Sequence, residues 1–307
     1  YDIMVGSNIK LPENEYFTYV KKSDDDEGIG FAGWRVNDGE RVYQPGETVA
    51  VDGDSQIKPV WDFTWRSLQS VINKHKGGSF EVTLKSDLAP VDYGTSLIIP
   101  ADTSVTINLN GHTIDRKATS VRGNPTGVFT VFGGATLTLT GGGKVTGGNA
   151  RLGGGIYIAR GTLVVEDGVV ITGNTAKNGG GIYVDREGAA TLKPGVEVSG
   201  NTASEVGGGA YVCMGASLAL DGAAITSNAV STTTGKGGGV FLQGSTSSSL
   251  APAELYISGA TRVTDNLLRT YDARYEKDKT DNVYLSSSTC ITVDGDLDLS
   301  ENGARMG

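Results

Sequence analysis

Three consecutive glycines followed by an apolar–aromatic–apolar run recur along the second half of this chain. The copies read GGGIYI from residue 153, GGGIYV from 179, GGGAYV from 207 and GGGVFL from 237, and a degraded copy, DNVYLS, begins at 281. A second motif keeps the same phase as KVTGGNA, VITGNTA, EVSGNTA, AITSNAV and RVTDNLL. Two motifs that recur together, first at intervals of 26 to 30 residues and then after 44, indicate stacked copies of one structural unit.

The glycines do not match a phosphate-binding loop, which needs a single G-x-x-x-x-G-K-[ST] element between a strand and a helix. Here no Lys-Ser/Thr pair follows them, and short runs rich in β-branched residues, such as TLVV (162–165), flank them on both sides. The sequence therefore predicts an all-β fold. Each period forms one coil of a parallel β-helix with about three strands, and the coiling is right-handed, as parallel crossovers are.

Stacking in register predicts files of equivalent side chains along the solenoid. One interior apolar file is Val145, Ile171, Val198, Ile225 and Val263. A second, structural file is Asn149, Asn174, Asn201, Asn228 and Asn266. We expect each asparagine to bond backbone or its neighbour at a turn with positive φ.

The composition agrees with many tight turns and excludes several partners. The chain has 46 glycines and 8 prolines among 307 residues. A net charge of −9 without a Lys/Arg cluster argues against nucleic acid and anionic membrane surfaces. No apolar run is long enough to span a bilayer, so we expect no membrane insertion in this segment. Cys213 and Cys290 should lie about two coils apart, which predicts free thiols.

Residues 62–301 resemble the right-handed β-helix domains, of pectin-lyase-like fold, of large bacterial surface proteins. The resemblance rests on INLNGHTI (107–114), on GVFTVFGGATLTLTGGGKVTGGNA (127–150) and on the ITGNTAKNGGGIYV coils. It implies an extracellular location, either secreted or on a bacterial cell surface. The same fold carries adhesins, autotransporter-like passengers and polysaccharide enzymes, so the resemblance does not fix an activity.

We predict two domains, residues 1–61 and 62–307, with the clear repeat coils at about 127–300. The second domain starts with a helix at about 64–76, whose apolar face should cap the open end of the β-helix. Its face residues are Trp65, Leu68, Val71 and Ile72. The pattern F-x-G-W … Y-x-x-G … W in the first domain is similar to the Listeria–Bacteroides repeat. That resemblance implies a small β-grasp-like extracellular spacer. We expect the whole to be a monomer within a longer chain.

An aromatic position in each coil is the first candidate ligand-binding site. If the flanking apolar residues point inward, the aromatic residue points outward, and the rings form an external stripe. The stripe consists of Tyr157, Tyr183, Tyr211, Phe241 and Tyr284. It would stack sugar rings or dock a protein; the alternatives are cross-strand stacking that stabilises the sheet, or a face covered by loops.

Insertions between coils mark further candidate sites, because function on a solenoid often lies in such loops. Polar insertions fill residues 230–236 and 243–254, and a charged one fills 267–282. The last carries Arg269, Tyr271, Arg274 and Tyr275. It would bind an acidic or sugar-rich partner, or it is a disordered loop.

Catalytic, metal and cofactor sites are not predicted. Asp185 and Glu187 follow one strand, but the equivalent positions in neighbouring coils hold Ala159 and Cys213, so no carboxylate pair repeats. In DGDLDLSENGAR the alternating aspartates lack the Gly and Glu of an EF-hand loop. His75 and His112 have no companion at ligand spacing.

The sequence favours a non-catalytic extracellular adhesin or binding protein that recognises a glycan or a host surface partner. A glycan-active enzyme, either a glycoside hydrolase or a polysaccharide lyase, is the first alternative, and a structural stalk is the second.

Overall fold

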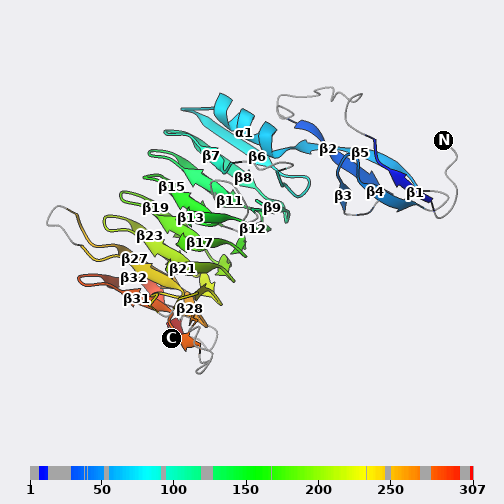
Figure 1. The fold of residues 1–307 in the computed structure, drawn as a ribbon. Coiled ribbons are helices and arrows are strands. Elements are labelled where there is room, and N and C mark those ends of the chain that lie inside the picture. Colours follow the sequence, from blue (N-terminus) through cyan, green and yellow to red (C-terminus); the bar gives the residue numbers. More distant parts are fainter. Residues whose placement is uncertain are drawn as a thin grey trace. The chain divides into compact units, whose positions relative to one another are not determined.

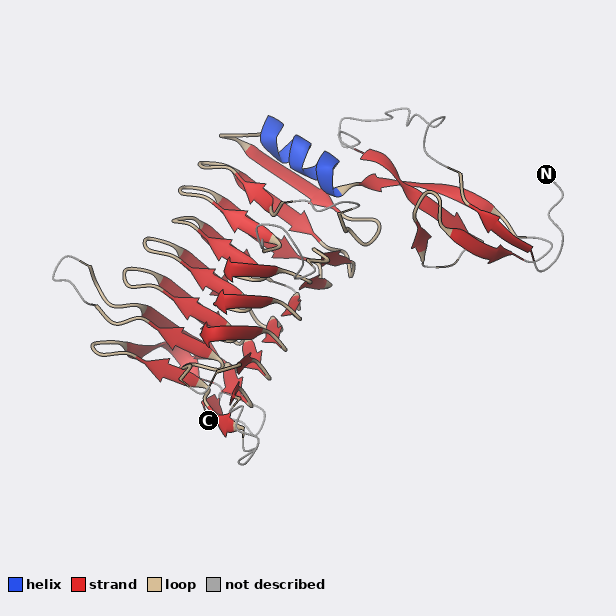
Figure 2. Cartoon of the chain, viewed as in Figure 1, coloured by secondary structure: helices blue, strands red, loops and turns tan. Residues whose placement is uncertain are grey.

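Four narrow β-sheets run along the repeated part of the chain in a computed structural model of the protein (Figures 1 and 2). The structure describes residues 7–12, 29–37, 39, 41–51, 55–90, 95–118, 127–166, 168–232, 234–245, 250–269, 278–297 and 305–306. The chain divides into two compact units, Tyr1–Val71 and Ile72–Gly307.

From β10 (Phe129–Val131) to β29 (Leu267–Leu268) of the second unit, each coil adds one strand to each of four sheets in turn. Sheet I is β7 (Leu97–Ile99), β10 (Phe129–Val131), β14 (Ile156–Ile158), β18 (Ile182–Val184), β22 (Ala210–Val212), β26 (Val240–Leu242) and β31 (Val283–Leu285). Sheet II is β6 (Ser79–Thr83), β8 (Ser104–Asn108), β11 (Thr136–Thr140), β15 (Thr162–Val165), β19 (Ala189–Leu192), β23 (Ser217–Asp221), β27 (Glu254–Gly259) and β32 (Cys290–Leu297). Sheet III is β9 (Thr113–Asp115), β12 (Lys144–Thr146), β16 (Val170–Thr172), β20 (Glu197–Ser199), β24 (Ala224–Thr226), β28 (Arg262–Thr264) and β33 (Arg305–Met306). Sheet IV is β13 (Asn149–Leu152), β17 (Thr175–Asn178), β21 (Thr202–Val206), β25 (Ala229–Val230), β29 (Leu267–Leu268) and β30 (Lys279–Thr280).

The predicted all-β fold with a parallel β-helix is confirmed. Neighbouring coils pair in parallel and in register, and only β29 and β30 pair antiparallel within these four sheets. The sequence predicted about three strands per coil, and the structure has four. The difference arises because the few residues between each asparagine and the next glycine triplet pair as a strand of their own, which forms sheet IV.

The core is the space that the sheets enclose. Strands such as β11 alternate buried and half-buried positions, so every second side chain faces the interior. The predicted apolar file from Val145 to Val263 is confirmed, because its members pair in succession and none is exposed to solvent. Each such buried aliphatic side chain contributes about 1.5–3 kcal/mol through loss of contact with water.

The glycine and asparagine motifs keep the same phase because they meet inside the coil. A Cβ on the third glycine of a triplet, Gly181, would lie 2.7 Å from the carbonyl oxygen of Gly209 in the next coil. It would also lie 3.0 Å from Nδ2 of Asn201 and 2.9 Å from Val198. Glycine is thus required where a ladder asparagine and two coil backbones crowd together.

The one helix among the described residues, α1 (Trp65–Lys74), includes the point in the sequence where the two units divide, between Val71 and Ile72. Its first turn is capped by Thr64 and Ser67: the Ser67 backbone N–H donates to Thr64 Oγ1 at 3.1 Å, and the Thr64 N–H donates to Ser67 Oγ at 2.9 Å. The four apolar residues predicted for its face are buried. Gly77, at φ 76°, follows it.

The first unit contains two small antiparallel sheets. They are β1 (Ser7–Lys10) with β4 (Thr48–Val51), and β3 (Val42–Tyr43), β2 (Ile29–Val36) and β5 (Ile57–Phe63). The Phe31 ring packs edge-on to Trp34 and Trp61, with centroids 5.0 and 5.7 Å away. Gly33, at φ 145°, lies at a bulge of β2 where a Cβ would collide with the Tyr43 carbonyl oxygen. These contacts explain the F-x-G-W pattern.

Candidate binding surfaces

The asparagines form a continuous file of hydrogen bonds inside the solenoid. We call Asn174, Asn201, Asn228, Asn266 and Asn282 the asparagine file; their exposed fractions are 4% or less. In each step the backbone N–H and Nδ2 of one asparagine both donate to Oδ1 of the next, at 2.9–3.0 Å. Nδ2 of Asn174, Asn201, Asn228 and Asn266 also donates to a backbone carbonyl of the preceding coil. The file is therefore structural, because its polar atoms are bonded within the chain.

The prediction that Asn149 begins this file was wrong by one residue. Asn149 pairs with Thr175, and the position before Asn174 in the file is occupied by Gly148, whose N–H donates to Asn174 Oδ1 at 3.0 Å. The file instead extends to Asn282 at its other end. The positive φ lies on the residue before the asparagine in the first four members of the file, namely on Gly173, Gly200, Ser227 and Asp265.

The aromatic position of each coil also forms a column, on the outer face of sheet I. We call Tyr157, Tyr183, Tyr211, Phe241 and Tyr284 the aromatic column; these residues pair in register from strand to strand. The first two rings meet edge to face at 5.7 Å, and the following pairs stack with centroids 4.6, 5.1 and 5.3 Å apart. The structure thus brings all five predicted residues together.

Stacking removes the central rings from solvent. Tyr183 is 8% exposed and Tyr211 9%, where the sequence predicted external rings, because each is covered by a ring on both sides. A ring whose two faces are covered has no face left for a sugar. Cross-strand stacking, the alternative interpretation from the sequence, accounts for these central rings.

At one end of the column, the hydroxyls of Tyr157 and Tyr183 each contact a residue in the turn that follows the neighbouring strand of the next coil. Tyr157 Oη donates to Asp185 Oδ2 at 2.8 Å, and Tyr183 Oη lies 3.1 Å from Cys213 Sγ. Burial, then the bond to Asp185, raises the pKa of Tyr157 to about 12. Burial is also the main cause that raises the pKa of Tyr183 and the pKa of Cys213, the latter to about 11. The Cys213 thiol is therefore a poor nucleophile.

The charged insertion is only partly described. Arg269 is exposed directly after β29, and its backbone N–H donates to the Val230 carbonyl at 2.8 Å. Tyr271, Arg274 and Tyr275 lie outside the described residues.

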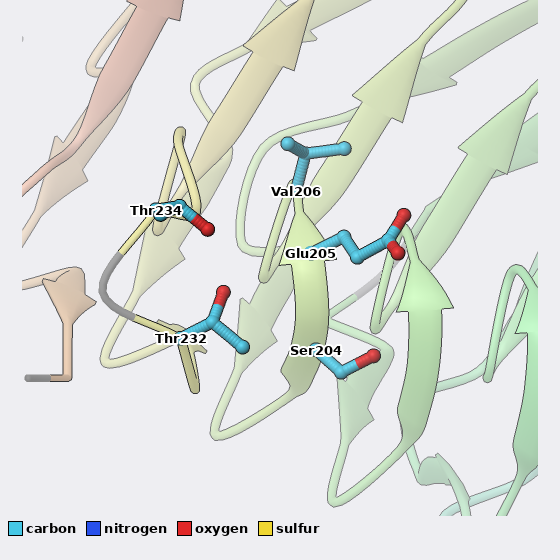
Figure 3. Close-up of a pocket in the computed structure, with 5 residues that line it drawn as sticks. All are labelled: Ser204, Glu205, Val206, Thr232 and Thr234. Carbon is cyan, nitrogen blue, oxygen red and sulfur yellow. The ribbon is translucent and has the colours of Figure 1, made fainter. Parts of the chain in front are cut away.

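A cavity of about 520 Å³ opens beside β21 (Figure 3). Its lining residues are Ser204, Glu205, Val206, Thr232 and Thr234. Figure 3 shows the two threonines on a turn at one side and the other three on β21 at the opposite side. Glu205 Oε1 pairs with Lys177 Nζ at 2.9 Å, and both side chains are about half exposed. Three hydroxyl side chains and one carboxylate, which is paired with Lys177, thus border one hollow on the outer surface.

A β-bulge creates this hollow. Ala176 pairs with Ala203, but the next pairing joins Asn178 to Val206, so Ser204 and Glu205 occupy the place of Lys177 alone. The turn after β25 then folds back, and the Gly235 N–H donates to the Thr232 carbonyl at 3.2 Å. Gly235 is required there, because a Cβ would collide with Val230 and lie 2.7 Å from the Glu205 carbonyl oxygen.

The sequence predicted an insertion at 230–236 but missed Ser204 and Glu205. The available signal was the spacing from asparagine to glycine triplet, which is five residues in Asn174–Gly179 and six in Asn201–Gly207.

The remaining predicted polar residues take part in ordinary surface contacts. Glu187 Oε2 lies 4.0 Å from Arg160 Nε, and Asp185 is the acceptor for Tyr157. Cys213 is buried and Cys290 exposed, both as free thiols. In the described ranges, no group of three or more His, Cys, Asp or Glu side chains could hold a metal ion. No helix in the described part of the chain has the length and apolarity of a membrane span.

Comparison with known proteins gave no match to a family model, a curated protein or a solved structure.

Proposed function

We propose that the chain is a non-catalytic binding module of an extracellular protein, secreted or held on a bacterial cell surface, and that its ligand is a glycan. The observation that carries this proposal is the cavity beside β21, where a bulge interrupts a regular solenoid and the lining includes three hydroxyl side chains and Glu205, which pairs with Lys177. Bulges of this kind often redirect side chains beside functional sites.

The chemistry of the hollow suits a hydroxylated ligand. A carboxylate such as Glu205 accepts charge-assisted hydrogen bonds from sugar hydroxyls, and Lys177 Nζ donates to sugar oxygens. The hydroxyls of Ser204, Thr232 and Thr234 both donate and accept. Because none of the described residues that line the cavity is aromatic, each site would bind weakly, and useful affinity would come from several sites on one cell surface.

We also propose the finer architecture that the resemblances imply. The solenoid would be a right-handed, pectin-lyase-like β-helix, supported by its parallel in-register coils. The first unit would be a Listeria–Bacteroides-type repeat, supported by the packing of Phe31 against Trp34 and Trp61. Both imply an extracellular setting.

A glycan array probed with the labelled chain tests the proposal. We expect a restricted set of glycans to be retained, with at least about tenfold weaker binding after Glu205→Gln, because a neutral amide loses the charge-assisted acceptor. Glu197→Gln, on the outer face of sheet III, is the matched control and should bind as the parent does. Failure of every glycan to bind would reject the proposal and favour the structural stalk, and equal binding by Glu205→Gln would reject the cavity beside β21 as the glycan site.

Release of reducing ends from the retained glycans separates binding from catalysis. Glycoside hydrolysis uses two carboxyl groups about 5–9.5 Å apart, and Glu205 is the one carboxylate among the described residues that line the cavity. We therefore expect binding without release. Measurable release that Glu205→Gln abolishes would favour the glycan-active enzyme instead.

A further inference from the structure

Phe132 presents an aromatic ring to solvent at the turn that follows β10. Of the aromatic residues that the structure describes, Phe132 alone is exposed, at 41%. The strand pairing places Pro100 beside it in the preceding coil and Ala159 beside it in the next coil. Neither neighbour is aromatic, so the stacking that covers the rings of the aromatic column does not cover this ring.

The turn after this ring, residues 132–135, leaves a backbone donor free. In the equivalent turn of a later coil, the N–H of the second residue, Arg186, donates to Asp185 Oδ1 at 2.8 Å. The second residue here is Gly133, and none of the described residues accepts a hydrogen bond from its N–H. This N–H is therefore available to an oxygen atom of a ligand beside the Phe132 ring.

Two charged side chains flank the glycines of this turn, one from each neighbouring coil. A Cβ on Gly134 would collide with the Asp102 carboxylate, so this carboxylate lies against Gly134. None of the described residues forms an ion pair with Asp102. On the other side, a Cβ on Gly133 would lie 3.6 Å from Cβ of Arg160, whose side chain is 72% exposed. An aromatic ring, a carboxylate, a guanidinium group and a free N–H thus surround one bare turn.

This combination suits a sugar ring. The face of an aromatic ring carries the negative side of its quadrupole and attracts the C–H groups of a sugar. A carboxylate accepts charge-assisted hydrogen bonds from hydroxyl groups, and a backbone N–H donates to them. The apolar patch is about one ring wide, far below the roughly 800 Å² that each partner buries in a stable protein interface. A small hydroxylated ligand therefore fits this surface better than a protein does.

A single aromatic ring can contact only one face of a ligand. Galactose gathers C–H groups on one face, because one of its hydroxyls is axial, whereas glucose divides its C–H groups between both faces. We propose that Phe132, Asp102 and the Gly133 N–H form a binding site for a galactose-configured sugar. The sugar stacks on Phe132, and its hydroxyls bond to the Asp102 carboxylate and the Gly133 N–H. This site lies in other coils than the cavity beside β21 and does not depend on the function proposed for that cavity.

The test measures binding of methyl β-D-galactopyranoside to the whole chain by saturation-transfer NMR, with methyl β-D-glucopyranoside as the matched epimer. We expect saturable binding of the galactoside and clearly weaker binding of the glucoside. Phe132→Ala should weaken galactoside binding about tenfold, because both the apolar contact and the ring are lost. Phe132→Trp should retain binding and Phe132→Leu should not, which separates ring stacking from apolar contact alone. Because Phe132 is exposed, these changes leave the core intact.

A second variant tests the polar part of the site. Asp102 has a φ of 56°, a conformation that asparagine also adopts, so Asp102→Asn keeps the turn and removes the charge. It should weaken galactoside binding at least about threefold. Glu205→Gln, in the cavity beside β21, is the control and should bind the galactoside as the parent does.

Three results would overturn the proposal: absence of galactoside binding, equal binding of the two epimers, or equal binding by Phe132→Ala. Loss of galactoside binding in Glu205→Gln but not in Phe132→Ala would also overturn it, because the sugar would then occupy the cavity beside β21. Retention of other glycans that depends on Glu205 leaves the function proposed for the cavity intact in each case.

Discussion

The asparagine file and the aromatic column run through the same coils with the same period. The file requires one residue type at every position, whereas the column requires only an aromatic ring. Between Asn174 and Asn282 every position in the file is asparagine, because each must supply both an acceptor and two kinds of donor. The column accepts Phe241 between Tyr211 and Tyr284 and keeps its stacking distances, because stacking requires only a ring.

The difference shows how a repeated residue in a solenoid should be interpreted. A side chain that repeats on the outside is not thereby a ligand platform, since its nearest neighbour is the same side chain one coil away. Free surface arises where the period is broken. In this chain it arises at the bulge of β21, where Ser204 and Glu205 belong neither to the file nor to the column.

The largest expected effect comes from breaking the file. Asn201→Ala removes the acceptor for the Asn174 N–H and Nδ2 and the donor to the Ile171 carbonyl, all of which are buried. We expect the free energy of unfolding, measured with urea, to fall by about 3–5 kcal/mol. Asn149→Ala is the control, because Asn149 lies beside the file, and it should change the value by less than about 0.5 kcal/mol. Equal losses would mean that the file does not carry this stability.

Loss of a ring from the column should lower the free energy of unfolding, whereas loss of only the hydroxyl should not. Tyr211→Ala deletes a ring stacked on both faces and should cost about 2–4 kcal/mol in the free energy of unfolding. Tyr211→Phe should stay within about 0.5 kcal/mol of the parent, as Phe241 occurs naturally in the column. A costly Tyr211→Phe would show that the column, like the file, depends on polar contacts.

A substitution where the glycine triplet contacts the asparagine file should lower the free energy of unfolding by an intermediate amount. Gly181→Ala pushes a methyl group toward the Gly209 carbonyl oxygen and Asn201 Nδ2, and should destabilise the chain by about 1–3 kcal/mol. Gly133→Ala is the control, since its Cβ would meet nothing closer than 3.6 Å. Thermal unfolding of the two variants side by side measures the difference. Similar midpoints would show that the crowding at Gly181 is relieved without cost.

Alkaline pH should destabilise the aromatic column but not the asparagine file, because only the column has side chains that ionise in this range. We expect this change in stability to be the smallest of the four. Tyr157, Tyr183 and Tyr211 have a pKa above the unfolded value of about 10, so their neutral forms stabilise the fold. That contribution is complete below about pH 10 and is lost as pH rises through the folded pKa, about 12 for Tyr157. We expect the urea midpoint to decline over this window, and to decline less in Tyr157→Phe. A midpoint that does not change up to about pH 12 would contradict the prediction.

Much of the fold was predictable because it repeats. The phase of GGG and NTA predicted parallel coils, and the alternation around Val145 and Ile171 predicted the interior. Asn149 was misplaced because Gly147, Gly148 and Asn149 align equally well with Gly173 and Asn174 in two ways, and only the strand pairing decides between them.

The candidate site was less predictable, for physical reasons. Alternation predicts which side of a strand Tyr183 faces, but its exposure depends on how closely the next ring stacks, which is a property of coil spacing. The cavity depends on one additional residue, in NTASEVGGG relative to NTAKNGGG, and on how the turn after β25 folds back over it. A single extra residue indicates a bulge, but it does not show which side chains gather around it.

The parallel in-register pairing also has a mechanical consequence. The hydrogen bonds between two neighbouring coils share an axial force, whereas the successive coil boundaries lie in series and each bears the whole force. Under tension the solenoid should therefore lengthen in discrete steps, each releasing one coil of 26–30 residues, or about 90–100 Å of extended chain.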